Sequence, residues 1–137
     1  MRVFLDSSGL AKRYIREPGS DAVQAILAEA TEAAVSLIAP PEIVSALNRL
    51  RRQSALAGPQ YVQAKEALFA DLEDMAVINL TVQVVRSAID LLERFPLRTL
   101  DALHVACALE WPADLFVSAD RQQLAAAAAS GLRTRRV

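Results

Sequence analysis

The sequence predicts an α/β fold with a mostly parallel central sheet of four to five strands, covered by helices on both faces. Short apolar runs alternate along the chain with longer segments whose apolar residues recur at helical spacing. Strands that alternate with helices need crossover connections, which are right-handed and place helices on the faces of a parallel sheet. The chain has 137 residues, of which 53% are hydrophobic. We therefore expect a single domain over residues 1–137 with one sizeable core.

The first half of the chain is expected to hold two strands and four helices. Proline, glycine and small polar residues separate these segments, and apolar stripes at helical spacing identify the helices. In chain order we predict a strand over 2–5, a short helix over 10–16, a helix capped by Ser20, a strand over 34–38, a helix beginning at Pro40-Pro41 and a helix over about 60–75.

The second half continues the alternation. Thr81 is a suitable cap for a helix whose apolar residues Val82, Val85, Ile89 and Leu92 are expected to face the core. The other predicted elements are a strand over 76–80, a helix over 99–109, a strand over 114–118, a helix from about Arg121 and a last strand over 133–137.

Composition excludes several classes of protein. No apolar run approaches the roughly 20 residues of a membrane helix, and the apolar start is too short for a signal peptide. Cys107 is the only cysteine, so no internal disulfide forms, and we expect a cytoplasmic protein. The net charge of −1 does not by itself indicate a nucleic-acid binder. Thirteen of the fifteen basic residues are arginines, which suit phosphate groups. A GC-rich genome that favours Arg codons is an equally good explanation, so composition does not decide between them.

Four carboxylates stand where the predicted strands end or the next helices begin. Asp6 ends the first strand, and Asp120 lies just past the fourth. Glu42 falls in the first turn of the helix after the second strand, and Asp101 in the first turn of the helix that leads toward the fourth strand. In open α/β sheets ligands bind beyond the carboxyl ends of the strands. We therefore expect these four acids to converge in one crevice.

Each acid alone also has an ordinary structural explanation. Asp101 and Glu42 would complement the dipoles of their helices. Asp120 would serve as a helix cap and Asp6 as a turn residue. These explanations do not account for the convergence of all four acids at one rim of the sheet.

A cluster of carboxylates calls for a cation. Two like charges about 5 Å apart repel by roughly 3 kcal/mol at an effective dielectric near 20. The set contains only oxygen ligands, which favours Mg²⁺ or Mn²⁺. Such an ion lowers the pKa of a bound water and neutralises charge on a phosphate. We therefore expect phosphodiester hydrolysis by a metal-activated water.

The chain resembles the PIN-domain nucleases, and most closely the VapC-type toxins of bacterial toxin–antitoxin pairs. The segments that carry the resemblance span the chain in order, namely 4–8 (FLDSS), 16–20 (REPGS), 41–47 (PEIVSAL), 99–106 (TLDALHVA) and 116–120 (FVSAD). The resemblance implies a PIN-like three-layer α/β/α sandwich. It also implies an RNA-cleaving site of Asp6, Glu42, Asp101 and Asp120 with Mg²⁺ or Mn²⁺, a homodimer, and inhibition by a cognate antitoxin.

Four further residues are candidates for a supporting role. Ser7 follows the first acid, and the family often has a hydroxyl where Ser118 stands. Arg49 lies two turns after Glu42 on the same helical face and would reach phosphate, although a surface arginine is the simpler interpretation. His104 stands three residues after Asp101, where we expect a structural or supporting role and not a general base.

Other functions compete with the nuclease interpretation. Receiver domains and haloacid-dehalogenase-like phosphatases also place acids after the first strand. The phosphatases need a second Asp where this chain has Ser8, and both use a late lysine, whereas none follows Lys65. A non-catalytic module that binds RNA or protein would be expected to lack an acid, but all four are present. A free-standing RNA-processing nuclease would share the chemistry, and only a neighbouring antitoxin gene would separate it from a toxin.

Overall fold

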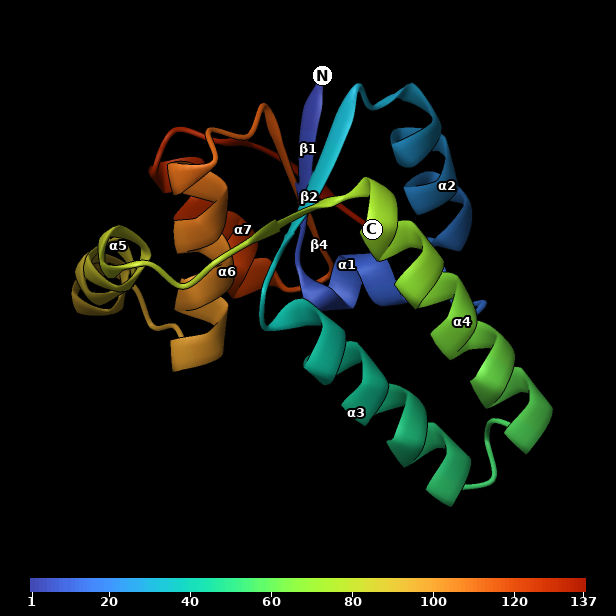
Figure 1. Cartoon of the computed structure of the whole chain (residues 1–137). Coiled ribbons are helices and arrows are strands. Elements are labelled where there is room, and N and C mark those ends of the chain that lie inside the picture. Colours follow the sequence, from blue (N-terminus) through green and yellow to red (C-terminus); the bar gives the residue numbers. More distant parts are fainter.

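The central layer is a five-stranded, wholly parallel sheet with the strand order β3-β2-β1-β4-β5 (Figure 1). The computed structural model describes all residues from Met1 to Val137. The strands are β1 (Arg2–Leu5), β2 (Glu32–Ser36), β3 (Ala76–Ile78), β4 (Leu115–Ser118) and β5 (Arg133–Arg136). The predicted α/β class with a mostly parallel sheet of four to five strands is confirmed.

Seven helices flank this sheet. They are α1 (Ser7–Ala11), α2 (Ser20–Glu29), α3 (Ala39–Arg52), α4 (Gly58–Asp74), α5 (Val82–Arg94), α6 (Thr99–Glu110) and α7 (Arg121–Ala129). None of them is long and apolar enough to span a bilayer.

Alternation along β1 gives each face of the sheet its own core. Val3 and Leu5 pack into one cluster with residues of α1, α2, α3 and α4. Phe4 packs into the other with residues of α5, α6 and α7, and its ring lies over that of Phe116 with centroids 6.0 Å apart. Successive strand residues point to opposite faces, so the buried run of β1 serves both cores. The result is the expected three-layer sandwich.

The beginning of α1 differs from the prediction. The helix starts at Ser7, not at residue 10, because the Asp6 side chain accepts a hydrogen bond from the Gly9 N–H and caps it. It ends at Ala11, well before residue 16. Ser20 does not cap α2; its hydroxyl accepts from the Glu17 N–H and donates to a carbonyl of the preceding turn. The strand expected over 34–38 lies two residues earlier.

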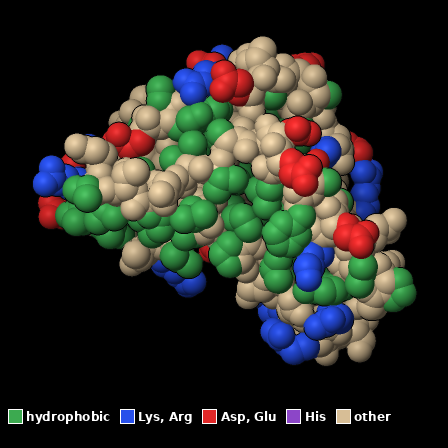
Figure 2. All heavy atoms as spheres, viewed as in Figure 1, with side chains coloured by type: hydrophobic (Ala, Val, Ile, Leu, Met, Phe, Trp, Pro, Cys, Tyr) green, Lys and Arg blue, Asp and Glu red, His purple; other side chains and the backbone are tan.

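The inward face of α5 was predicted wrongly. Thr81 does cap the helix, but the residues that face the core are Val84, Ala88 and Leu91. The expected core residues are exposed: Val82 by 67%, Val85 by 43%, Ile89 by 48% and Leu92 by 36%. The helix carries two apolar stripes of equal spacing, and periodicity alone does not choose between them. Figure 2 shows hydrophobic side chains gathered in a band over this side of the molecule, from α5 toward α3 and α4.

Candidate active site

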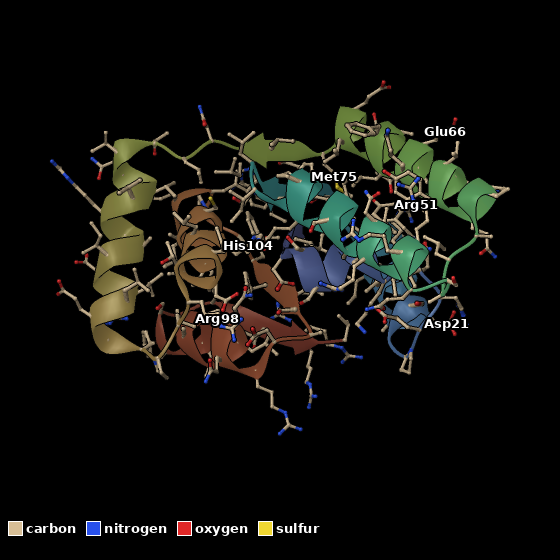
Figure 3. All side chains as sticks on the ribbon, turned by 90° about the horizontal axis from the view of Figure 1, so that it is seen from below. Asp21, Arg51, Glu66, Met75, Arg98 and His104 are labelled. Atoms are coloured by element: carbon tan, nitrogen blue, oxygen red, sulfur yellow. The ribbon has the colours of Figure 1, made fainter.

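All four predicted acids line one open cavity at the carboxyl ends of the strands. The chain runs down β1 into α1 at this end, and Figure 3 looks onto it from below. Asp6 follows β1, Asp120 follows β4, Glu42 lies in the first turn of α3, and Asp101 lies in the first turn of α6. The structure therefore brings together side chains from four separate segments.

Asp6 is the most constrained of the four. It is 1% exposed, and its carboxylate accepts hydrogen bonds from the Ser8 hydroxyl at 2.8 and 2.9 Å, the Gly9 N–H at 2.9 Å and the Ser118 hydroxyl at 2.9 Å. Burial raises the pKa of Asp6 above its usual value, although these donors and the nearby His104 act in the opposite direction. A buried carboxyl of raised pKa is a group that a neighbouring cation would help to ionise.

Close packing of α1 on β4 holds Asp6 in place. A Cβ at Gly9 would stand 2.9 Å from the Val117 carbonyl oxygen and 3.3 Å from the Asp6 carboxylate. Only glycine lets the helix approach the strand this closely. The Asp6 N–H donates to the same Val117 carbonyl at 3.2 Å. The glycine of the Asp-Ser-Ser-Gly segment therefore serves packing at the site.

Glu42 belongs to a three-membered hydrogen-bond cluster. Its Oε1 accepts from the Ser7 hydroxyl at 2.6 Å and lies 2.5 Å from Nε2 of His104. The imidazole points from α6 toward α1 and α3 (Figure 3), is 1% exposed and lies 3.2 Å from the Ser7 hydroxyl. Burial alone would raise the pKa of Glu42, but the hydrogen bonds from His104 and Ser7 bring it below its usual value. Glu42 is thus held as a carboxylate.

Asp101 and Asp120 form the other half of the cavity. The Asp120 carboxylate caps α7 through the N–H groups of Gln122 and Gln123 at 2.8 and 3.2 Å. The Gln123 side chain turns back and donates to Asp101 Oδ1 at 3.0 Å. Burial, and then the negative charge of Asp120, raises the pKa of Asp101. Like-charge repulsion acts within this pair, and a cation would relieve it.

Ser118 connects the two halves of the site. Its buried hydroxyl donates to Asp6 and accepts from the Asp120 N–H at 2.9 Å. Two basic residues lie on the cavity wall. Lys12 is committed, because its ammonium donates to the Pro18 carbonyl at 2.8 Å and pairs with Glu17 at 3.5 Å. The guanidinium group of Arg49 makes no hydrogen bond or ion pair. The wall therefore offers one uncommitted cation beside the acids.

The donor set fits a hard divalent cation that keeps part of its water shell. No three acidic or imidazole side chains lie close enough together to hold one ion directly. Mg²⁺ in proteins usually binds through one or two carboxylates and several waters, so this spacing suits it better than a closed cage would. Burial raises the pKa of Asp6, and burial together with the charge of Asp120 raises that of Asp101, so a cation near either carboxylate would favour its ionised form.

Sequence reasoning missed two polar residues of the site. Ser8 links Asp6 to β4, because its hydroxyl also accepts from the Ala119 N–H at 3.0 Å. Gln123 is 3% exposed and connects the Asp101 and Asp120 segments. The spacing of Asp120 and Gln123 matches a capping box, but no such box forms, because the Asp120 N–H donates to Ser118 and the Gln123 side chain to Asp101. No local pattern marks Ser8.

The chain is similar to known proteins both in sequence and in fold. The PIN domain family model matches residues 3–129. Ribonuclease VapC46 of Mycobacterium tuberculosis is 32% identical over 113 residues, which cover 82% of this chain and 78% of that protein. The structure of VapC20 of M. tuberculosis, described as a sarcin-ricin loop cleaving toxin, has a TM-score of 0.73 at 18% identity and covers 98% of this chain and 99% of that chain. A toxin–antitoxin complex from Klebsiella pneumoniae has a TM-score of 0.68 at 17% identity, covering 90% of each chain.

Proposed function

The chain belongs to the PIN domain family and to its VapC ribonucleases, and we propose that it is a divalent-cation-dependent endoribonuclease that acts through Asp6, Glu42, Asp101 and Asp120. The observation that carries the proposal is the convergence of these four acids, which come from both ends of the chain, on one cavity. Packing needs no such arrangement, because two helix caps and two first-turn acids would serve their helices equally well facing solvent.

Each residue of the cavity would have its own role in the reaction. Asp6 and the Asp101–Asp120 pair would hold Mg²⁺ or Mn²⁺ in part through its waters, because no three of these side chains are close enough to bind one ion directly. When bound, such an ion supplies charge to the phosphate and lowers the pKa of a coordinated water. Glu42, kept ionised by His104 and Ser7, is placed to orient a water or accept its proton. Arg49 is placed to contact a phosphate of the RNA.

Toxin activity and an antitoxin partner form part of the same proposal. Matching structures include toxin–antitoxin complexes, and the acidic cavity is open enough for a protein segment to enter. We also propose a homodimer through α5. Its exposed residues Val82, Val85, Ile89 and Leu92 form an apolar stripe next to the core-facing one, and an uncovered stripe of this kind is characteristic of an assembly surface.

The test is cleavage of a circular RNA, which has no ends for an exonuclease. We expect a linear product with Mg²⁺ or Mn²⁺ and no product with EDTA. Asp120→Asn is a suitable inactive variant because asparagine also caps helices well. Cleavage that persists in EDTA, or in Asp120→Asn at the wild-type rate, would contradict the proposal.

A second experiment separates a toxin from a free-standing RNA-processing nuclease. Induced wild-type protein should arrest growth of its host, Asp120→Asn should not, and co-expression of the protein encoded by a small adjacent gene should restore growth. Cleavage in vitro without growth arrest would favour the free-standing nuclease. RNA binding without cleavage, in the presence of metal, would leave a non-catalytic binding module.

A further inference from the structure

The edge strand β5 carries a row of arginines that the proposed chemistry does not use. Its four residues are Arg133, Thr134, Arg135 and Arg136, and all are exposed. β5 lies at the end of the sheet and pairs only with β4. One edge of the molecule therefore carries three cations within four residues, with Arg133 and Arg135 on one face of the sheet and Arg136 on the other.

These cations are not neutralised within the protein. The ion pairs of the chain involve other basic residues, namely Arg2, Lys12, Arg13, Arg16 and His104, and no side-chain hydrogen bond involves β5. Charged side chains on an edge strand also discourage edge-to-edge pairing. That role is served by either sign of charge and does not require three arginines, whereas a planar guanidinium is well suited to phosphate.

The register of the sheet brings the C-terminal end of this row next to a residue that contacts the acids. Arg136 pairs with Ser118, whose hydroxyl donates to Asp6, and the Val137 N–H donates to the Ser118 carbonyl at 3.2 Å. With a strand rise of about 3.3 Å per residue, the row extends roughly 10 Å back from the rim. The exposed Arg121, directly after Asp120, lies between the row and the acids in sequence and at the same rim.

The distribution of charge indicates a function for arginines that lie next to the acids. A cavity with four carboxylates repels the phosphates of a nucleic acid, so a substrate needs cations beside the acids to stay in place. In a chain whose net charge is −1, a local row of unpaired arginines supplies such a contact without making the whole protein basic.

We propose that Arg133, Arg135 and Arg136 bind phosphates of single-stranded RNA next to the bond that is cut, so that β5 is the substrate's docking edge. This inference rests on the proposed function and deepens it by assigning the path of the RNA. An acidic protein segment is the other polyanion that would fit the row, and the experiment below separates the two.

The test measures binding apart from cleavage. In an Asp6→Asn background, fluorescence anisotropy with a labelled single-stranded RNA gives the dependence of log Kd on log salt concentration. Each phosphate contact in a single strand contributes about 0.7 to that slope, so Arg133→Gln/Arg135→Gln/Arg136→Gln should lower it by about 2. The control Arg52→Gln/Lys65→Gln/Arg86→Gln changes the net charge equally at exposed sites on α3, α4 and α5 and should lower the slope far less. The corresponding triple lysine variant of β5 should keep most of the slope and shows that the strand tolerates substitution.

The outcomes are distinct. A slope that falls equally in the β5 variant and in the control would overturn the proposal. A slope that is the same in the β5 variant as in wild type would also overturn it, and would leave an acidic protein segment as the ligand of β5. In the wild-type background the β5 variant should raise KM for RNA cleavage and keep kcat; a loss of kcat at constant KM would also overturn it. If wild type binds RNA through β5 but does not cut it, the nuclease proposal fails and the docking edge stands.

Discussion

His104 and Glu42, which are 62 positions apart in the sequence, are in direct contact, with His104 Nε2 lying 2.5 Å from Glu42 Oε1. The imidazole is buried, and its Nδ1 has no hydrogen-bond partner in the protein. Because the Nε2–H points at a carboxylate, the single histidine of the chain holds Glu42 in position and keeps it ionised. His104 is thus a positioning residue for an acid of the cavity.

Replacing His104 should weaken catalysis more than folding. We expect His104→Ala to lower the rate of RNA cleavage by about 10- to 100-fold, which is the usual cost of removing a group that orients a metal-site ligand. His104→Gln keeps a donor and should recover part of the loss. Circular dichroism melts of both variants show whether the fold persists. An Ala variant that is folded and fully active would show that Glu42 needs no such support.

Gln123 should tune the affinity for the cation. Its amide donates to Asp101 Oδ1 at 3.0 Å, while its own Oε1 is buried without a partner. Gln123→Leu removes the donor and leaves Asp101 free to turn away, so we expect Mn²⁺ binding by calorimetry to weaken by about 10-fold. The exposed neighbour Gln122→Leu is the matched control. Equal Mn²⁺ affinities in the two variants would remove Gln123 from the site.

Asp71 should make stability depend on pH in acid. Burial opposes its ionisation, but Arg13 binds it through two nitrogens at 2.5 and 3.0 Å and the Tyr14 hydroxyl at 2.8 Å, which lowers its pKa. A lowered pKa stabilises the folded state above the unfolded value of about 3.9, and that stability is lost as pH falls through the folded pKa.

Asp71→Asn should therefore reduce the free energy of unfolding by about 1–2 kcal/mol at pH 7. The difference between variant and wild type should shrink as pH falls below about 4. Urea unfolding at several pH values measures it. A difference that stays constant over that range would show that the ion pair is not its source.

The exposed stripe on α5 should mediate self-association. Ile89→Glu places a charge in the middle of this stripe and should convert a dimer to a monomer in light scattering, with the fold retained. Gln83→Glu, on the same helix outside the stripe, should leave the dimer intact. A wild-type protein that is monomeric at high concentration would contradict the dimer.

Elements of the fold followed from local signals wherever one face or one cap was unambiguous. The apolar run of β1, the cap at Thr81 and the prolines in the first turn of α3 each specify a single structure. On α5, by contrast, two stripes of equal spacing compete, and the choice depends on which one meets α6. That contact is tertiary and leaves no mark in the helix's own sequence.

The site, like the fold, could be predicted from the sequence only in part. The positions of Asp6, Glu42 and Asp120 at one rim follow from strand order and the rule for parallel sheets. Their hydrogen-bond partners do not, because Ser8, His104 and Gln123 reach the acids across segments that are distant in sequence. Polar networks of this kind depend on side-chain geometry and not on periodicity.

The most direct test of the account is metal-dependent cleavage by Asp6→Asn beside wild type. Asparagine keeps the size of the side chain and its capping of α1, and removes the negative charge. Asp90→Asn, a change of the same kind at an exposed site on α5, is the control. We expect wild type and Asp90→Asn to cut RNA only with Mg²⁺ or Mn²⁺, and Asp6→Asn to be folded and inactive. Equal cleavage by a folded Asp6→Asn protein would contradict the assignment of the carboxylate site.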